Sequence, residues 1–321
     1  MLMLDLLIIG GSAAATTAGI YGIRRGLNLK IITKEFGGEV ATSGEIGNWP
    51  GDGMTDGIAL SDKFKKHLEY YKVDMEEGVT VKSIVRVSDP VKSFNKAQDH
   101  GASGYFNVST EKGMDYTAKA VIVATGVHPR ELNVAGEKEY RNKGVSYCST
   151  CDMPLFAGKT VAVIGGGNSA LESGLMGVDI AKKVYVINKN AFFKGEDVLI
   201  KKLESAKEKV RILYEAKTTE IVGDKFVTGF KYNDKDGKEQ KLNVDGIFIH
   251  IGSIPNSHVV SEEVERDKFG AIKVNLNCET NIPGLYAAGD VTDVSFKQIV
   301  IAAGQGCIAA LSAVQYLNKL K

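Results

Sequence analysis

Short apolar runs, each leading into a glycine-containing turn, recur along this chain. They cover residues 6–9, 119–124, 244–251 and 284–288. Runs of this length without polar alternation are typical of strands that are buried on both faces of a parallel sheet. Residues from about 298 to 320 are instead rich in Ala and Leu at helical spacing, which predicts a long, well-buried helix.

Two stretches of the chain repeat one pattern of strand, glycine-rich turn, helix and strand. Aligning them places Gly10 over Gly165, and the same register places residues 29–33 over residues 184–188. Each copy therefore has the pattern of the βαβ unit of a nucleotide-binding fold. We predict an α/β protein with two Rossmann-like dinucleotide-binding domains.

The order of the runs predicts that the second nucleotide domain is inserted into the first. The first domain would comprise residues 1–127 and 246–321, and the inserted domain residues 128–245. Residues 88–103 are polar and lack apolar periodicity, so we expect a surface loop or hairpin tip there.

The two glycine-rich turns carry the residue types that a bound pyrophosphate requires. Glycine lets the backbone approach phosphate oxygens at the positive end of a helix. The second turn keeps both close-approach glycines, Gly165 and Gly167, and Ala170 is an accepted third residue. In the first turn Ser12 replaces a glycine, which weakens the approach but adds a hydroxyl donor. We favour dinucleotide binding over a purely structural turn in both copies.

Asp290 follows the apolar run 284–288 and Gly289. A carboxylate at the carboxyl end of a parallel strand faces the cofactor crevice. A helix cap is the alternative role. Together with the first glycine turn, Asp290 is better explained as the acceptor for a sugar hydroxyl of a flavin cofactor.

Cys148 and Cys151 are two thiols three positions apart, and Asp152 follows directly. A zinc site needs four ligands, whereas Cys278 and Cys307 stand alone and no His lies at ligand spacing. A structural bridge across two residues would stabilise little. We therefore favour a redox dithiol, with Asp152 able to deliver or accept the proton of thiol exchange.

Composition adds constraints on partners and compartment. The 321 residues carry a formal net charge of +1, with 44% apolar and 25% charged residues, as in soluble globular proteins. This charge offers no field for nucleic acid or an anionic membrane, and no sequence run approaches the ~18 apolar residues of a membrane helix. Four cysteines do not form a secreted disulfide framework, so we expect a cytoplasmic protein with no metal, nucleic-acid or membrane partner.

The motifs together resemble those of the low-molecular-weight thioredoxin reductases, which are class II pyridine nucleotide-disulfide oxidoreductases. The resemblance covers essentially the whole chain. It is carried by Cys148-x-x-Cys151-Asp152, Gly165-x-Gly167-Asn168-Ser169-Ala170, Asn48-Trp49-Pro50-Gly51, Ala124-Thr125-Gly126, Gly284-x-x-Ala287-Ala288-Gly289-Asp290, Lys297-Gln298 and residues 303–310.

This resemblance implies FAD in the first domain, with Asp290 on the ribityl chain and Gln298 near the isoalloxazine ring. It implies NADPH or NADH in the inserted domain, which also carries the dithiol. The cofactor-binding residues that it implies are Gly10, Ser12, Ala13, Glu35, Gly38, Asn48, Thr125, Gly126, Gly165, Gly167, Asn168, Ser169, Lys189, Lys194, Gly289, Asp290, Lys297 and Gln298.

The resemblance also implies a path for electrons from the nucleotide through FAD and the dithiol to a thioredoxin-like protein. Cys151 would face the flavin, Cys148 would attack the partner disulfide, and Asp152 would act as acid–base. The family rotates its inserted domain between two poses, which suggests hinges near residues 127–128 and 245–246. A homodimer is expected on the same ground.

One departure from the family concerns the nucleotide donor. Where the family reads the 2′-phosphate of NADPH with His-Arg-Arg-x-x-x-Arg, residues 188–194 read Asn-Lys-Asn-Ala-Phe-Phe-Lys. Lys189 and Lys194 supply point charges without the planar guanidinium fork, and Asn188 is not the acid that would indicate NADH. NADPH, NADH and weak binding of either therefore remain open.

Two alternatives to this function remain. One is a flavoenzyme that uses another reductant or passes electrons from a dithiol to oxygen. The other is not an enzyme but a flavin-binding redox sensor. His250 and Trp49 are explained by core packing.

Overall fold

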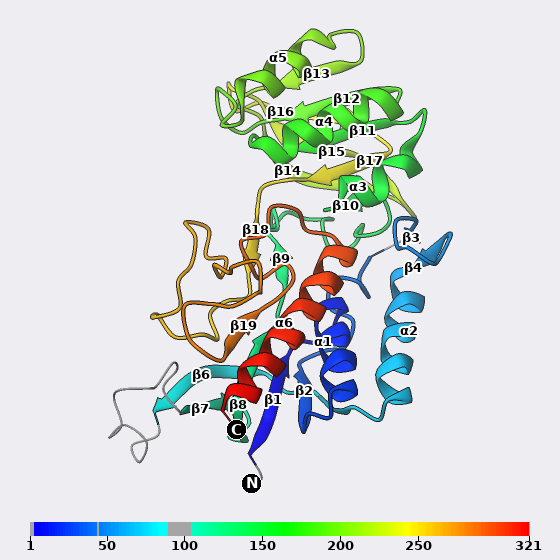
Figure 1. Ribbon diagram of the computed structural model, residues 1–321. Coiled ribbons are helices and arrows are strands. Elements are labelled where there is room, and N and C mark those ends of the chain that lie inside the picture. Colours follow the sequence, from blue (N-terminus) through cyan, green and yellow to red (C-terminus); the bar gives the residue numbers. More distant parts are fainter. Residues whose placement is uncertain (1–2, 44, 89–103, 321) are drawn as a thin grey trace. The chain divides into compact units, whose positions relative to one another are not determined.

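The computed structural model describes residues 3–43, 45–88 and 104–320 (Figure 1). Its chain divides into two compact units, one of residues 1–128 and 254–321 and one of residues 129–253. Each unit is built on its own largely parallel sheet with helices. The predicted α/β class with two nucleotide-type domains is confirmed.

The sheet of unit 1 has the βαβ pattern of the first sequence repeat at its centre. Parallel pairing joins β2, β1 and β8, and β5 and β19 extend the parallel part. The side chains of Leu6, Leu7 and Ile8 are completely buried, as expected of a strand covered on both faces. The strands are β1 (Leu4–Ile9), β2 (Leu29–Thr33), β5 (Asp74–Glu77), β6 (Val81–Ser88), β7 (Gly104–Thr110), β8 (Asp115–Val123) and β19 (Leu285–Ala287).

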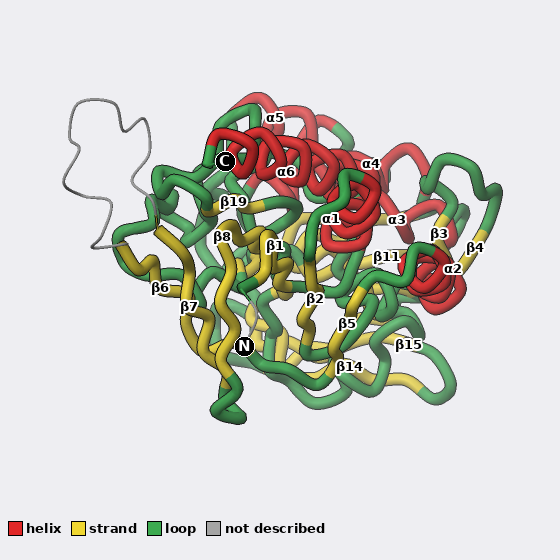
Figure 2. The backbone as a smooth tube through the Cα atoms, turned by 60° about the horizontal axis from the view of Figure 1, so that its bottom comes forward, coloured by secondary structure: helices red, strands yellow, loops and turns green. Residues whose placement is uncertain are grey.

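Helices α1 (Ala13–Arg24) and α6 (Ile299–Lys319) lie side by side in unit 1 (Figures 1 and 2). Small residues permit this packing, since a Cβ added to Gly306 would lie 2.1 Å from the carbonyl oxygen of Ala14. Only one face of α6 is buried, so the prediction of a well-buried helix holds for that face alone. By length and composition alone, α6 is also long and apolar enough to cross a membrane.

The remaining elements of unit 1 lie at its edges. Helix α2 (Gly57–Tyr70) begins at Asp56, whose carboxylate accepts a hydrogen bond of 2.8 Å from the Ala59 N–H, an N-cap. Two short strands, β3 (Glu45–Ile46) and β4 (Thr55–Asp56), pair with each other before α2. Most of the polar stretch 88–103 lies outside the described residues.

The main sheet of unit 2 is entirely parallel and repeats the pattern of unit 1. Its strands, in spatial order, are β10 (Val145–Ser146), β17 (Gly246–Ile249), β11 (Thr160–Ile164), β12 (Lys183–Ile187) and β13 (Val210–Leu213). Its helices are α3 (Ser149–Asp152), the 3₁₀ helix η1 (Met153–Phe156), α4 (Asn168–Ile180) and α5 (Asp197–Ser205).

The expected domain boundary after residue 245 differs from the structure. Strand β17 pairs with β10 on one side and β11 on the other, so it belongs to unit 2. The chain leaves unit 2 only after Ser253, and a hinge at 245–246 would fall inside the sheet of this unit. The break at 128–129 lies one residue from the expected first boundary.

Unit 2 also holds an antiparallel sheet that the apolar runs did not predict. It consists of β14 (Lys217–Gly223), β15 (Val227–Asn233) and β16 (Glu239–Asn243). Short strands β9 (Val127–Pro129) and β18 (Ser253–Pro255) lie where the chain passes between the units.

Candidate active site

The two cysteines of the predicted dithiol form a disulfide in unit 2. Cys148 precedes the one-turn helix α3 and Cys151 lies within it, with a Cα–Cα distance of 5.3 Å. The Cys151 N–H donates a hydrogen bond of 3.3 Å to the Cys148 sulfur. Both cysteines are half-buried. The turn thus brings the sulfurs together while leaving them partly accessible.

Asp152 is fixed beside this disulfide by Ser146, the last residue of β10. The Ser146 hydroxyl donates a hydrogen bond to the Asp152 carboxylate and accepts one of 3.0 Å from the Cys148 N–H. A single buried hydroxyl therefore ties the acid to the backbone of the first cysteine. Sequence reasoning did not identify Ser146, because a serine at the end of a strand has no distinctive pattern.

A second unpredicted pair fixes the backbone on the other side of Cys148. The buried Glu137 carboxylate accepts a hydrogen bond of 2.8 Å from the Tyr147 hydroxyl. It also accepts bonds of 2.7 Å from the N–H groups of Leu132 and Asn133. Burial and this carboxylate raise the pKa of Tyr147, so its hydroxyl remains a donor.

His250 contacts the dithiol turn, which corrects its interpretation as a packing residue. Its Nε2 is hydrogen-bonded to the hydroxyl of Ser149, the residue that follows Cys148 on the chain. Burial lowers the pKa of His250 to about 4, so the imidazole is neutral at neutral pH.

The second glycine turn has the close approach and the open space that the sequence predicted. Gly165 has a φ of +153°, and a Cβ there would lie 2.1 Å from the His250 carbonyl oxygen. Gly167, in contrast, has no heavy atom within 4 Å of its virtual Cβ. No side chain caps α4 at Gly167, so the first N–H groups of this helix are available to an anion. These features fit a dinucleotide pyrophosphate.

The loop after β12 places Lys194 at this turn. The Lys194 N–H donates a hydrogen bond of 2.7 Å to the Gly166 carbonyl, and the side chains of Lys189 and Lys194 are exposed. Asn168 is bonded to Glu196 through both its amide groups, and Ser169 is exposed. The lysines are thus available as point charges near the turn.

Asn188 has a structural task in the same loop. It is buried, its Oδ1 accepts a hydrogen bond of 3.0 Å from the Asn190 N–H, and its Nδ2 donates one of 2.9 Å to the Phe192 carbonyl. The amide therefore shapes the loop that carries the two lysines.

In unit 1, the predicted flavin residues converge at the carboxyl ends of β1, β8 and β19. A Cβ on Gly10 (φ +135°) would lie 2.1 Å from the Ala124 carbonyl oxygen. One on Gly38 would lie 3.5 Å from Ser12, which precedes α1, and one on Gly289 would lie 3.2 Å from Ala14. The turn, the loop after β2 and the segment after β19 therefore meet at one place.

Four further predicted residues lie as two pairs. The Asn48 amide donates a hydrogen bond of 3.1 Å to the Gln298 side chain, although 250 positions separate the two. Asp290 lies three residues beyond the end of β19, and its charge interacts with that of Lys297. The Lys297 ammonium donates a bond of 2.6 Å to the Thr292 carbonyl.

The surroundings of Asp290 fit a sugar hydroxyl. Burial raises its pKa to about 6, with Lys297 opposing and Glu39 adding to this shift. Within residues 3–43, 45–88 and 104–320, we find no group that donates a hydrogen bond to this carboxylate. A mostly buried acceptor without a donor gains from a bound hydroxyl group.

The other predicted residues have local roles as well. The Thr125 hydroxyl donates a hydrogen bond of 2.8 Å to the Asn256 carbonyl, and Gly126 (φ +66°) has open space around its virtual Cβ. The Glu35 carbonyl accepts a bond of 2.8 Å from Thr33, and Ala13 is buried in the core. Cofactor contacts by these residues stay predictions.

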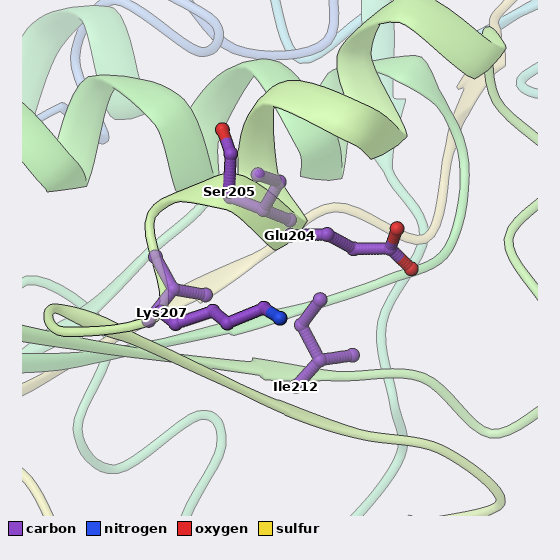
Figure 3. Close-up of a pocket in the computed structure, with 6 residues that line it drawn as sticks. Glu204, Ser205, Lys207 and Ile212 are labelled. Atoms are coloured by element: carbon purple, nitrogen blue, oxygen red, sulfur yellow. The ribbon is translucent and has the colours of Figure 1, made fainter.

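A separate pocket lies between α5 and β13, with Glu204 and Lys207 on its walls (Figure 3). It contains none of the predicted site residues. In the described part of the chain, no cluster of His, Cys, Asp or Glu could hold a metal ion. The pocket is lined by Leu203, Glu204, Ser205, Lys207, Val210 and Ile212.

Comparison with known proteins points to the same type of enzyme throughout. The pyridine nucleotide-disulphide oxidoreductase family matches residues 4–306. One of the alkyl hydroperoxide reductase proteins of Staphylococcus aureus is 39% identical over 314 residues, which are 98% of this chain but 59% of that protein. The chain thus spans little more than half the length of these curated relatives.

Solved structures match over the full length. Thioredoxin reductase from Streptococcus pyogenes is 32% identical with a TM-score of 0.88, covering 99% of both chains. Thioredoxin reductase from Giardia duodenalis is 31% identical with a TM-score of 0.88, covering 99% of this chain and 100% of that one.

Proposed function

Because the chain belongs to the pyridine nucleotide-disulphide oxidoreductase family, we propose that it is an NAD(P)H-dependent flavoprotein that reduces a thioredoxin-like protein disulfide. The observation that carries this proposal is the Cys148–Cys151 disulfide beside Asp152. It lies in a unit that also has an open glycine turn for a nucleotide. The full-length likeness to two thioredoxin reductases supports the choice of acceptor.

FAD supplies, when bound, a two-electron carrier between the nicotinamide nucleotide and the disulfide. The chain's own residues bind and orient it. Asp290 accepts a sugar hydroxyl, Gly10 lets the backbone approach the pyrophosphate, and the Asn48–Gln298 pair lies at the start of α6. In unit 2, Gly167 and the first turn of α4 take the pyrophosphate of the nucleotide.

The dithiol then reduces the acceptor by two exchange steps. The Cys148 thiolate attacks one sulfur of the acceptor disulfide, forming a mixed disulfide and releasing the other acceptor sulfur as a thiolate. The Cys151 thiolate next attacks the Cys148 sulfur, which restores the disulfide and releases the second acceptor thiolate. Asp152 moves the protons that the thiols lose and the acceptor gains. Two electrons and two protons pass to the acceptor in each cycle.

The donor is NADPH or NADH. Lys189 and Lys194 are exposed cations near the glycine turn, which favours recognition of a 2′-phosphate by charge. The buried Asn188 amide is occupied by the loop backbone, and no acid stands in its place to accept a ribose hydroxyl.

A second candidate acceptor is the disulfide of a peroxide-reducing partner. The 39% identity to the alkyl hydroperoxide reductase protein over 98% of this chain favours it. Both acceptors would use the same thiol exchange at Cys148, so they differ only in the partner that docks at the dithiol.

We also propose a cytoplasmic homodimer. Val300, Gly304 and Ile308 form an exposed stripe at helical spacing on the outer face of α6. A second copy that covered this stripe would remove apolar surface from water. Light scattering coupled to size-exclusion chromatography measures the mass, and introducing an acid at Ile308 should yield monomers.

The test of the proposed function is anaerobic reduction followed by turnover. NADPH or NADH should bleach the absorbance of the bound flavin, and the loaded enzyme should then reduce oxidised thioredoxin catalytically. A flavin that neither nucleotide bleaches would indicate another reductant. A single stoichiometric reduction without turnover would indicate a redox sensor.

A further inference from the structure

Ser149, which follows Cys148 on the chain, is held from two sides in unit 2. Its buried hydroxyl is hydrogen-bonded to Nε2 of His250 and to the hydroxyl of Ser173 in α4. His250 follows β17, so two separate elements of the unit anchor the first residue of α3.

The partners satisfy one another chemically. A hydroxyl has one hydrogen and two lone pairs, so Ser149 donates to one partner and accepts from the other. Either tautomer of a neutral His250 completes this chain. Loss of one member leaves a buried polar group unpaired, which costs free energy.

The main chain fixes His250 itself. Its N–H donates a hydrogen bond of 2.7 Å to the Ile164 carbonyl at the end of β11. Its own carbonyl oxygen lies against Gly165, where a Cβ would come within 2.1 Å of it. The imidazole therefore projects from the most rigid part of the unit, the centre of the parallel sheet.

We propose that His250 is a positioning residue for the Cys148–Cys151 dithiol. Through Ser149 it holds the backbone between the two sulfurs in the geometry that the disulfide requires. Two thiols held in place close a disulfide at a higher effective concentration than two mobile ones. This inference rests on the redox role of the disulfide and not on which protein or nucleotide the enzyme uses.

The measurable consequence is the equilibrium between dithiol and disulfide. Removing the anchor should make the disulfide easier to reduce, because the freed turn no longer favours closure. We expect the equilibrium constant for disulfide formation to fall about tenfold, which corresponds to a rise of about 30 mV in the midpoint potential of this two-electron couple.

The experiment is an anaerobic titration of the FAD-loaded full chain in dithiothreitol redox buffers. Alkylation of the free thiols, read by mass spectrometry of the peptide that contains Cys148 and Cys151, reports the reduced fraction. The variants are Ser149→Ala, His250→Leu, their combination, and His250→Gln, whose amide retains a hydrogen-bonding group. Thr150→Ala is the matched control, since it removes an exposed hydroxyl between the same cysteines.

The inference predicts that Ser149→Ala and His250→Leu shift the equilibrium in the same direction and that their combination adds little, because both break one chain of bonds. His250→Gln should restore most of the effect and Thr150→Ala should leave the equilibrium unchanged. Thermal unfolding is recorded for each variant. A variant that loses stability while keeping the wild-type potential would overturn the proposal, as would a full additive shift in the combined variant. If His250→Leu does not fold, Ser149→Ala, which removes a single oxygen atom, decides the question.

Discussion

The Ser146 hydroxyl is hydrogen-bonded to the carboxylate of Asp152. The same oxygen accepts the N–H of Cys148, so the acid and the first cysteine share one anchor. A carboxylate held in this way stands beside the dithiol turn before any acceptor arrives. Its position, more than its chemical type, suits it to move protons during thiol exchange.

Replacing Asp152 by Asn should therefore slow acceptor reduction without affecting earlier steps. We expect kcat with oxidised thioredoxin to fall about 100-fold, in the range of general acid–base contributions. Ser146→Ala should have a smaller effect of about tenfold, because the acid remains but is less well placed. Stopped-flow flavin reduction by the nucleotide serves as the control. An equal slowing of flavin reduction in Asp152→Asn would contradict the role.

The two glycines of the second turn should respond differently to the same substitution. Gly167→Ala should weaken nucleotide binding at least about tenfold with unchanged thermal stability, since its Cβ fills only the space open to the pyrophosphate. Gly165→Ala should destabilise unit 2, because its Cβ meets the His250 carbonyl and its φ of +153° disfavours alanine. Calorimetric titration and thermal unfolding measure the two effects. Equal loss of stability in both variants would show that Gly167 has only a structural role.

Alanine in place of both Lys189 and Lys194 should raise the KM for NADPH about five- to tenfold and change that for NADH less than about twofold. Exposed ion contacts of this kind are each worth roughly 0.5 kcal/mol, and salt should reduce the difference. Lys207→Ala is the matched control, an exposed lysine of the same unit that lines the separate pocket. Equal changes for both nucleotides would show that these lysines do not read the 2′-phosphate.

Asp290 should make the flavin-free protein sensitive to pH. Its folded-state pKa of about 6 lies above the ordinary value of 3.8, so its folded form binds the proton more tightly than its unfolded form. The associated stability is complete below pH 3.8 and is lost as the pH rises through 6. Asp290→Asn should therefore be more stable than wild type by about 2 kcal/mol at pH 7 and nearly equal to it at pH 4.

Urea unfolding of the apoprotein at both pH values measures this difference. The same variant should retain FAD less well, because the amide cannot replace the carboxylate as an acceptor of equal strength. If Asp290→Asn were less stable than wild type at pH 7, burial would not be the source of the shift.

The sequence predicted the elements that carry strong periodicity. The repeated βαβ units, the helix over 298–320 and the apolar strands all appear close to their expected positions. The strands β14, β15 and β16 escaped notice because they alternate weakly and contain many charged residues, so no apolar run marks them. The boundary at 245 failed for a related reason, since nothing in the run 244–251 shows which sheet it joins.

Around the dithiol, the sequence identified the reactive residues but not their supports. Cys148, Cys151 and Asp152 form a recognisable motif, whereas Ser146, Glu137 and His250 act through contacts that no motif marks. A buried carboxylate that accepts backbone N–H groups, or a histidine after an apolar strand, has no fixed spacing from the group that it holds. His250 was assigned to packing for this reason, and only the fold brings it to Ser149.

The central claim is that electrons leave the protein through the Cys148 sulfur. Its most direct test is the Cys148→Ser variant in an anaerobic assay that records flavin reduction by NADPH or NADH and turnover of oxidised thioredoxin together. We predict that flavin reduction keeps its wild-type rate within about twofold, whereas thioredoxin turnover falls to the background of the uncatalysed exchange. Turnover of thioredoxin by Cys148→Ser at a rate near that of wild type would contradict the account.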